Sequence, residues 1–241
     1  QMGGIPTNIH GQVVTQDASN QSVVVNGLYA VGECSCVSVH GANRLGTNSL
    51  LDLIVFGRAA GNHIVAAHPE RQHAHQPLPQ ESVDFSLDRV NKLETRTKGE
   101  KTQVVGNEIR NAMQQHCGVF RTVASLEEGV RKIDELAGKV DNIAFQDKSK
   151  VFNTARIEAL EIDNLVEAAQ ATIVSAAARH ESRGAHTVDD YANSVEFPNG
   201  RNDKVWMKHS LWYSEGNRLD YKPVVTKPLT VDTFKPKPRT F

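Results

Sequence analysis

Apolar residues recur at helical spacing through the middle of the chain, from Ser82 to Ser182. One stripe alternates steps of four and three residues, which places it on a single helix face: Leu126, Val130, Ile133, Ala137 and Val140. Ser125 followed by Glu128 predicts a capping box at the start of that helix. The pattern predicts four helices, at 82–97, 103–117, 122–143 and 154–180, packed as a small antiparallel bundle.

The last of these helices is predicted to begin after Asn153, whose side chain can cap it. This helix carries a set of apolar and small residues at roughly helical spacing: Ile157, Leu160, Leu165, Ala168, Thr172 and Ala176. Gly184, within the run Glu181 to His186, is expected to end the helical region.

Short β-rich runs precede this region. Val23–Val25 and Leu28–Val31 are predicted to be strands joined by a turn at Asn26-Gly27. Gly32 follows the second run and lets the backbone turn sharply or approach a neighbouring element closely. A loop rich in small and polar residues then extends from Glu33 to Thr47.

One apolar helix follows this loop. Asn48 or Ser49 is predicted to cap it, and Pro69 is predicted to stop it near His68. Four small residues would let a neighbouring element pack closely against one stretch of it: Gly57, Ala59, Ala60 and Gly61.

Composition shifts divide the chain into an α/β stretch at 1–68, a linker at 69–81, a helical domain at 82–185 and a C-terminal segment at 186–241. The C-terminal segment is predicted to contain a strand at 205–213, where apolar and polar residues alternate. Proline and lysine from Lys222 to Arg239 predict an extended tail.

Length and composition are typical of a globular protein with one or two domains. The 241 residues include 39% hydrophobic and 23% charged residues, with 27 basic against 28 acidic side chains. A formal charge of -1 argues against nucleic-acid binding. The longest apolar run, 50–56, contains an acid and is far shorter than the ~20 residues of a membrane span, so no transmembrane segment is expected.

The chain begins with Gln1-Met2-Gly3-Gly4, which we interpret as a start inside a longer protein. Cys34, Cys36 and Cys117 are too few for a disulfide framework or a four-cysteine metal site, and are interpreted as small buried thiols in a reducing compartment. Four histidines in and before the linker are interpreted as solvated residues without a metal: His63, His68, His73 and His75.

Candidate chemistry is densest between the second β-rich run and the apolar helix. Glu33 follows a strand and a glycine, where α/β folds place acids that accept hydrogen bonds from cofactor hydroxyls. Arg44 can hold a carboxylate with two parallel hydrogen bonds, and His40 lies four residues away. The backbone amides of Ser49 and Leu50, expected at the helix start, suit an electron-rich ring edge. Hydrolase and phosphoryl-transfer motifs do not occur.

Five motifs together resemble the flavoprotein subunits of the succinate dehydrogenase family: Gly27 to Glu33, His40 to Gly46, Asn48 to Asp52, Val55 to Gly61 and Glu181 to His186. The similarity covers essentially the whole chain and corresponds to the C-terminal part of such a subunit. It implies that 1–68 is the C-terminal end of an FAD-binding, Rossmann-like domain, followed by a helical domain and a C-terminal segment.

The resemblance implies oxidation of succinate to fumarate by hydride transfer to FAD, with electrons passing through an iron–sulfur subunit and membrane anchor subunits to quinone. It implies a peripheral position on the cytoplasmic face of a bacterial inner membrane, or on the matrix face in mitochondria, through those partners. Covalent FAD attachment at a histidine, the dinucleotide glycine motif, the proton-shuttling arginine and the capping domain are all expected upstream. No catalytic residue is therefore expected within these 241 residues, and alone they are expected neither to retain FAD nor to oxidise succinate.

By position, Glu33 matches the family's FAD-binding acid and Arg44 the arginine that holds a substrate carboxylate. Ser49 and Leu50 match residues at the flavin, and no metal ligand is implied. After His186 the family commonly has an arginine and then an acid with a Phe/Tyr-Pro pair, whereas this chain reads Thr187 to Ala192. Arg183 is expected either to brace the C-terminal segment against the flavin domain or to be a charge at a helix end.

Three alternatives stay open. Fumarate reductase flavoproteins share the His-Gly-Ala-Asn-Arg and Asn-Ser-Leu patterns and catalyse the reverse reaction. The sequence does not indicate in which direction the reaction runs. L-Aspartate oxidase fits the region after Leu45 and the C-terminal tail less well. A non-enzymatic helical interaction module, formed from Ser82 to Phe241, is the alternative from another class.

Overall fold

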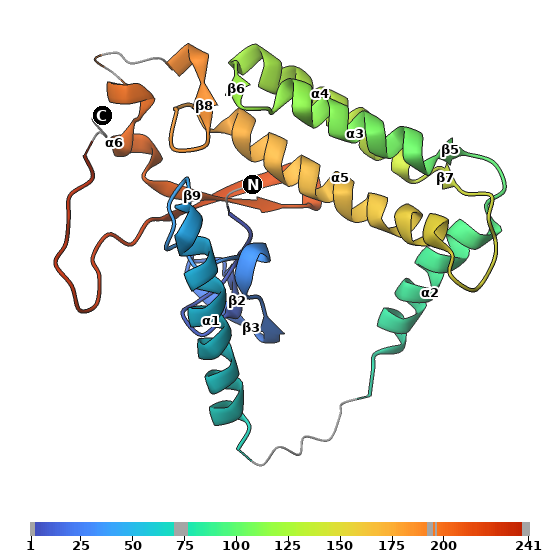
Figure 1. Ribbon diagram of the computed structural model, residues 1–241, viewed down its shortest axis with the longest axis horizontal. Coiled ribbons are helices and arrows are strands. Elements are labelled where there is room, and N and C mark those ends of the chain that lie inside the picture. The colour runs from blue at the N-terminus through green and yellow to red at the C-terminus, as the bar shows by residue number, and fades with distance from the viewer. Residues whose placement is uncertain (1–2, 70–76, 192–194, 196, 238–241) are drawn as a thin grey trace. The chain divides into compact units, whose positions relative to one another are not determined.

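The computed structural model describes residues 3–69, 77–191, 195 and 197–237 (Figure 1). The chain forms two compact units, one of Gln1–Gln76 with Arg183–His186 and the other of Pro77–Ser182 with Thr187–Phe241. The helical domain and the C-terminal segment, which the sequence separates, thus share one unit. The predicted domain bounds themselves stay a prediction.

The first unit combines short strands with one long helix. β1 (Ile5–Pro6) pairs in parallel with β4 (Ser35–Cys36), and β2 (Gln12–Gln16) pairs antiparallel with β3 (Ser22–Tyr29). A 3₁₀ turn, η1 (Gly32–Cys34), precedes β4, and α1 spans Gly46–Ala67. All sheets among the described residues have two strands, and the assignment of this stretch to the end of a Rossmann-like domain stays a prediction.

The predicted turn at Asn26-Gly27 is wrong, because both residues lie inside β3. The chain reverses instead between β2 and β3, where the Asp17 carboxylate accepts hydrogen bonds from the amides of Ser19 and Gln21 at 2.8 and 2.9 Å. An aspartate that bonds the backbone two residues on competes as a turn former with Asn-Gly, and here it prevails.

α1 begins at Gly46 after Leu45, so the predicted cap at Asn48 or Ser49 is wrong, whereas the predicted end is confirmed at Ala67. Ala60 is buried, and a Cβ placed on Gly11 would lie 3.0 Å from its Cβ, so the close approach predicted for the small residues occurs there. Gly57 and Gly61 have nothing within 4 Å of an added Cβ.

Most large apolar side chains of α1 are exposed, among them Leu50, Leu51, Ile54, Val55 and Val65. Within the described residues, α1 is also the helix that is long and apolar enough to cross a membrane, judged by length and composition alone. The run 50–56, from which no span was expected, is only part of this helix.

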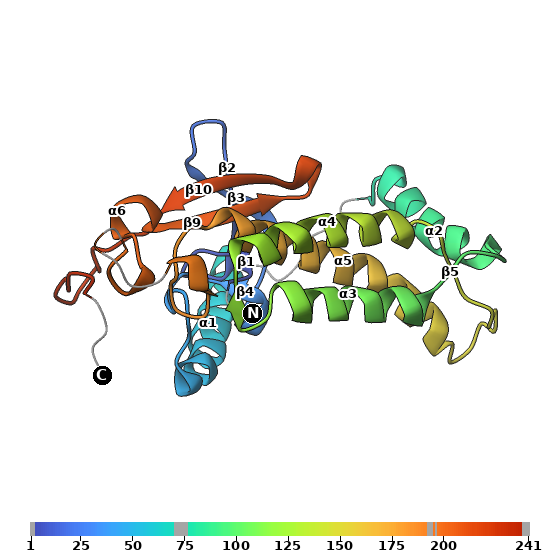
Figure 2. The same cartoon turned by 90° about the horizontal axis from the view of Figure 1, so that it is seen from above.

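The second unit contains α2 (Gln80–Thr95), α3 (Thr102–His116), α4 (Val123–Val140) and α5 (Thr154–Ala178). Each bound lies within about three residues of its prediction. α3, α4 and α5 lie side by side (Figure 2), and α2 packs against α5. Two parallel pairs of short strands join the helix ends: β5 (Glu100–Lys101) with β7 (Ile143–Ala144), and β6 (Phe120–Arg121) with β8 (Thr187–Val188).

The core of this unit lies between α3, α4 and α5. The stripe predicted on α4 is confirmed, with Leu126, Ile133 and Val140 buried and Leu136 added to them. On α5 the prediction is confirmed in part: Ala176 is buried, Leu160 and Leu165 pack half-buried against the core, and Ile157 and Ala168 are exposed. The buried residues of this helix are Ala159, Ile162, Val166, Ala169, Ile173 and Ala176. α5 carries apolar residues almost all round, so its sequence does not mark one face.

Side chains cap two of the helices. Asn153 accepts a hydrogen bond from the amide of Arg156 at 2.8 Å and caps α5 as predicted. The predicted capping box at Ser125 is wrong, because α4 begins earlier and the Thr122 hydroxyl accepts from the amide of Ser125 at 3.1 Å.

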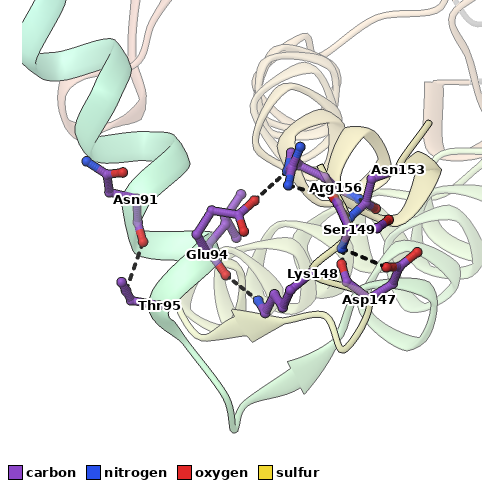
Figure 3. A network of polar contacts seen from close by, with 9 residues as sticks. Asn91, Glu94, Thr95, Asp147, Lys148, Ser149, Asn153 and Arg156 are labelled. Carbon is purple, nitrogen blue, oxygen red and sulfur yellow. Dashed lines mark hydrogen bonds and ion pairs between the residues drawn. The ribbon is translucent and has the colours of Figure 1, made fainter. Parts of the chain in front are cut away.

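Polar contacts join the end of α2 to the loop before α5 (Figure 3). Arg156 pairs with Glu94 and also donates to the Ser149 carbonyl at 2.9 Å. Lys148 donates to the Leu93 carbonyl at 2.7 Å. Hydrogen bonding from Ser149 holds the pKa of the Asp147 carboxyl below its ordinary value, so this loop is fixed by charge as well as by packing.

The C-terminal segment forms a β-hairpin. α6 (Asp203–Trp206) leads into β9 (Lys208–Tyr213), which pairs antiparallel with β10 (Arg218–Pro223) and packs against α5. The predicted strand is thus confirmed only from Lys208 onward. The described residues of the segment also form three 3₁₀ turns, η2 (Asp189–Tyr191), η3 (Pro198–Gly200) and η4 (Glu215–Asn217), and residues 224–237 contain no helix or strand.

The three cysteines are unpaired. Cys117 is buried as predicted, and burial raises the pKa of its thiol. Cys36 is half-buried and Cys34 is exposed, so the prediction of buried thiols is wrong for Cys34. Cys34 lies in the 3₁₀ turn η1 rather than in a strand, which explains its exposure.

Gly129 of α4 tests how closely the bundle is packed. A Cβ at this position would lie 2.6 Å from the Cβ of His116 and 2.9 Å from Cδ1 of Ile173. We expect Gly129→Ala to lower the free energy of unfolding by about 1 to 3 kcal/mol, measured by urea unfolding. The matched control is Gly138→Ala on the same helix, where nothing lies within 4 Å. It should be stabilising by about 0.5 to 1 kcal/mol, and equal effects of the two changes would contradict the packing.

His209 of β9 predicts a dependence of stability on pH. Burial, with smaller contributions from Lys222 and Arg179, lowers the pKa of His209. Below about pH 6.5 the unfolded chain therefore binds this proton more readily than the folded chain. Stability contributed by neutral His209 is complete above pH 6.5 and is lost as the pH falls toward the lowered pKa. His209→Gln should flatten the decline of the thermal midpoint between pH 7 and pH 5, and an unchanged slope would count against this.

Candidate functional site

Glu33 lies just after the buried residues that follow β3. Gly32 has a φ of +84°, a torsion that favours glycine, and a Cβ there would lie 2.7 Å from Cδ2 of Leu53 in α1. The chain then turns through η1, which leaves the Glu33 side chain 73% exposed. The carboxylate is accessible to a ligand at the position that the sequence predicted.

Arg44 lies in the loop before α1, and its Nη2 donates to Oε1 of Glu33 at 2.7 Å. The sequence assigned the two side chains to different ligands, one to a cofactor and the other to a substrate, and did not predict this ion pair. Glu33 is largely exposed, so the pair contributes little to stability and can be exchanged for ligand contacts at low cost.

His40 anchors the same loop to α1. Its Nε2 lies 2.7 Å from Oδ2 of Asp52, whose side chain is only 10% exposed. The other carboxylate oxygen, Oδ1, is buried and has no hydrogen-bond partner within the described residues. The sequence analysis gave Asp52 no role, although an acidic residue within an apolar helix can indicate a specific polar partner.

Ser49 and Leu50 do not open α1. Each amide in an α-helix donates to the carbonyl four residues earlier, so the helix start at Gly46 directs these two amides toward Leu45 and Gly46. The Ser49 hydroxyl donates to the Gly46 carbonyl at 3.0 Å, and the Leu50 side chain is 62% exposed. Their predicted positions at the helix opening are therefore wrong, and their assignment to the flavin stays a prediction.

A turn from the distant part of the chain contacts the Arg44 loop. Arg183 and His186 form a backbone bridge, and the amide of Ala185 donates to the carbonyl of Ala42 at 3.1 Å. The bracing role predicted for Arg183 stays a prediction.

Glu181, just before this turn, is fully buried, which the sequence did not indicate. Its carboxylate accepts from Nη1 of Arg179 and from the amide of Asn202, each at 2.9 Å. It therefore fixes the end of the second unit's long helix and is not available to a ligand.

Histidines near the linker take part in ring contacts. Nδ1 of His63 lies 2.9 Å from the Tyr29 hydroxyl, and its ring stacks on His10 at a centroid distance of 4.9 Å. His73 and His75 lie outside the described residues. In the part of the chain that the structure describes, no three His, Cys, Asp or Glu side chains gather closely enough to hold a metal ion.

The chemistry of the first unit fits part of an FAD site. The exposed Glu33 carboxylate and the unpaired Oδ1 of Asp52 are acceptors that hydroxyl or ring N–H groups can satisfy. The exposed apolar residues at the start of α1 suit a flat aromatic ring, and the N-terminus of α1 supplies partial positive charge.

Comparison with known sequences gives two family matches. The family described as "Fumarate reductase flavoprotein C-term" matches residues 106–241, more than half of the chain. The family described as "FAD binding domain" matches residues 1–50, which include Glu33 and Arg44.

Individual relatives agree with these matches. A succinate dehydrogenase flavoprotein subunit from Coxiella burnetii is 44% identical over 238 residues, which is 99% of this chain and 39% of that protein. A fumarate reductase flavoprotein subunit from Haemophilus influenzae is 36% identical over 212 residues, which is 86% of this chain and 34% of that protein. The chain thus spans well under half the length of these relatives.

A solved structure supports the same grouping. An E. coli quinol fumarate reductase superposes with a TM-score of 0.79 at 31% identity, covering 96% of this chain and 37% of that one. Family matches, relatives and fold agree, and the chain belongs to the succinate dehydrogenase and fumarate reductase flavoprotein family.

Proposed function

We propose that this chain forms the C-terminal part of a succinate dehydrogenase flavoprotein subunit, which oxidises succinate to fumarate. The observation that carries the proposal is Arg44, which lies beside the accessible Glu33 carboxylate in a loop that leads directly into α1. A cation, an acceptor and a helix N-terminus within one short stretch suit a dicarboxylate next to a flavin.

In this proposal Arg44 exchanges Glu33 for one substrate carboxylate, which its guanidinium binds through two parallel hydrogen bonds. The contact fixes the orientation of the carbon that loses hydride, which lowers the barrier by removing freedom of the substrate. When bound, FAD would accept the hydride, and the proton from the neighbouring carbon would pass to the arginine that the family resemblance places outside these 241 residues. Released from Arg44, Glu33 accepts from a cofactor hydroxyl, while the start of α1 favours negative charge at the ring.

The exposed apolar face of α1 fits the same proposal. Packing against the remainder of a flavin domain would bury these side chains, as the core of a larger domain requires. Through an iron–sulfur subunit and membrane anchor subunits, the flavoprotein would transfer electrons to quinone and lie peripherally on a membrane. The name of the E. coli relative, a quinol fumarate reductase, supports quinone as the distant electron carrier.

Fumarate reductase is the second candidate, since a Haemophilus influenzae relative has that name. The greater identity of the Coxiella burnetii succinate dehydrogenase, 44% against 36%, favours succinate oxidation. Turnover of succinate and of fumarate with matched quinones separates the two directions.

Arg44→Lys, in the flavoprotein that contains this chain, tests the substrate role. Lysine keeps the charge but cannot form two parallel hydrogen bonds. We expect kcat/KM for succinate to fall by about 30-fold to several thousand-fold, equivalent to about 2 to 5 kcal/mol, with bound flavin unchanged. Near-normal turnover would exclude the carboxylate role. Loss of flavin together with turnover would indicate that Arg44 supports the fold instead.

Glu33→Ala tests the cofactor role separately. Removing the acceptor should weaken noncovalent FAD binding by roughly 1 to 3 kcal/mol, measured as the FAD concentration that half-saturates the flavoprotein purified without flavin. Glu215→Ala, which removes a glutamate from η4 in the second unit, is the matched control and should leave this concentration unchanged. Equal half-saturating concentrations for both variants would contradict the assignment.

A further inference from the structure

We propose that the Arg183–His186 turn positions the Arg44 loop, and that Gly184 is the residue on which this contact depends. The inference rests on the proposed function for its effect on turnover, but the contact itself can be tested without it. Gly184 and Ala185 are positioning residues in this proposal, because they act on substrate only through Arg44.

The turn is a tight backbone structure. The amide of Arg183 donates to the carbonyl of His186 at 2.7 Å, and the amide of His186 donates back at 3.1 Å. Only Gly184 and Ala185 lie between them, and Gly184 has a φ of +60°. The turn therefore has a fixed shape, and the amide of Ala185 is free to donate outside it.

That donor is used on the loop that carries Arg44. It bonds the carbonyl of Ala42, two residues before the arginine, at 3.1 Å. His40 is tied to Asp52 at 2.7 Å, and α1 begins at Gly46. These contacts hold the chain before and after Arg44, so only residues 43–45 remain to set the position of its guanidinium.

Gly184 permits this contact because it has no side chain. A Cβ there would lie 2.7 Å from both the carbonyl carbon and the oxygen of Ala42, and 2.9 Å from its Cβ. The carbonyl carbon and oxygen are main-chain atoms of the loop, so a larger residue must move the loop or the turn. A displacement of about 1 Å in a residue that orients substrate can reduce turnover by roughly 100-fold.

Gly216 offers a matched control. It lies in η4 of the second unit with a φ of +68°, close to that of Gly184, but nothing lies within 4 Å of an added Cβ. Gly184→Ala and Gly216→Ala thus introduce similar backbone strain, and only the first disturbs Ala42.

The first measurement is the rate of brief tryptic cleavage after Arg44 in the flavoprotein that contains this chain, followed by mass spectrometry. Gly184→Ala should accelerate this cleavage by roughly tenfold relative to Gly216→Ala, because the Arg44 loop opens more often when its contact with the Arg183–His186 turn is disturbed. Equal rates in the two variants would overturn the proposal.

The second measurement is the pair of kcat and KM for succinate, together with flavin content. Gly184→Ala should raise KM and lower kcat while flavin is retained, whereas Gly216→Ala should leave all three unchanged. Faster cleavage with unaltered kcat and KM would support the contact between the turn and the Arg44 loop, and would refute the substrate role of Arg44. If Gly184→Ala fails to fold, Ala42→Val crowds the same contact from the loop side without changing a glycine, and the same two outcomes apply to it.

Discussion

The buried carboxylate of Glu181 fixes how the chain leaves the helical bundle. Such a charge is tolerated only when its oxygens are paired, and both are, with Arg179 and with the backbone of Asn202. Arg179 also donates to the carbonyls of Trp206 and Lys208, so one ion pair joins the end of α5 to α6 and β9. Glu181 therefore holds the chain in place where it leaves α5.

Much of the helical unit was predictable because its information is local and periodic. α4 alternates apolar and charged residues, and its stripe was identified with the correct face. For α5 the same reasoning identified only part of the buried face, because alanines and aliphatic residues surround this helix and packing against α3 and α4 selects the face that is buried. The turn at Asp17 was missed for a different reason, because a side-chain bond to the backbone outweighed the Asn-Gly signal.

The candidate site was also predicted only in part. Glu33 and Arg44 could be found because each follows a recognisable local signal, a strand end or a glycine-flanked loop. The contacts of these residues could not be predicted, because they depend on how a loop closes in space. They are the ion pair of Glu33 with Arg44, the link from His40 to Asp52 and the bond from Ala185 to Ala42. The Ala185 bond joins residues 143 positions apart, and no spacing in a single sequence predicts such a contact.

That separation also governs the order of events during synthesis. A ribosome adds about 5 to 20 residues per second, so Ala185 emerges roughly 7 to 30 seconds after Ala42. The strands and the long helix of the first unit are complete in the nascent chain well before the turn that contacts their loop exists. The bond from Ala185 to Ala42 can therefore form only after the helical bundle has been translated, so this restraint on the Arg44 loop is acquired late in synthesis.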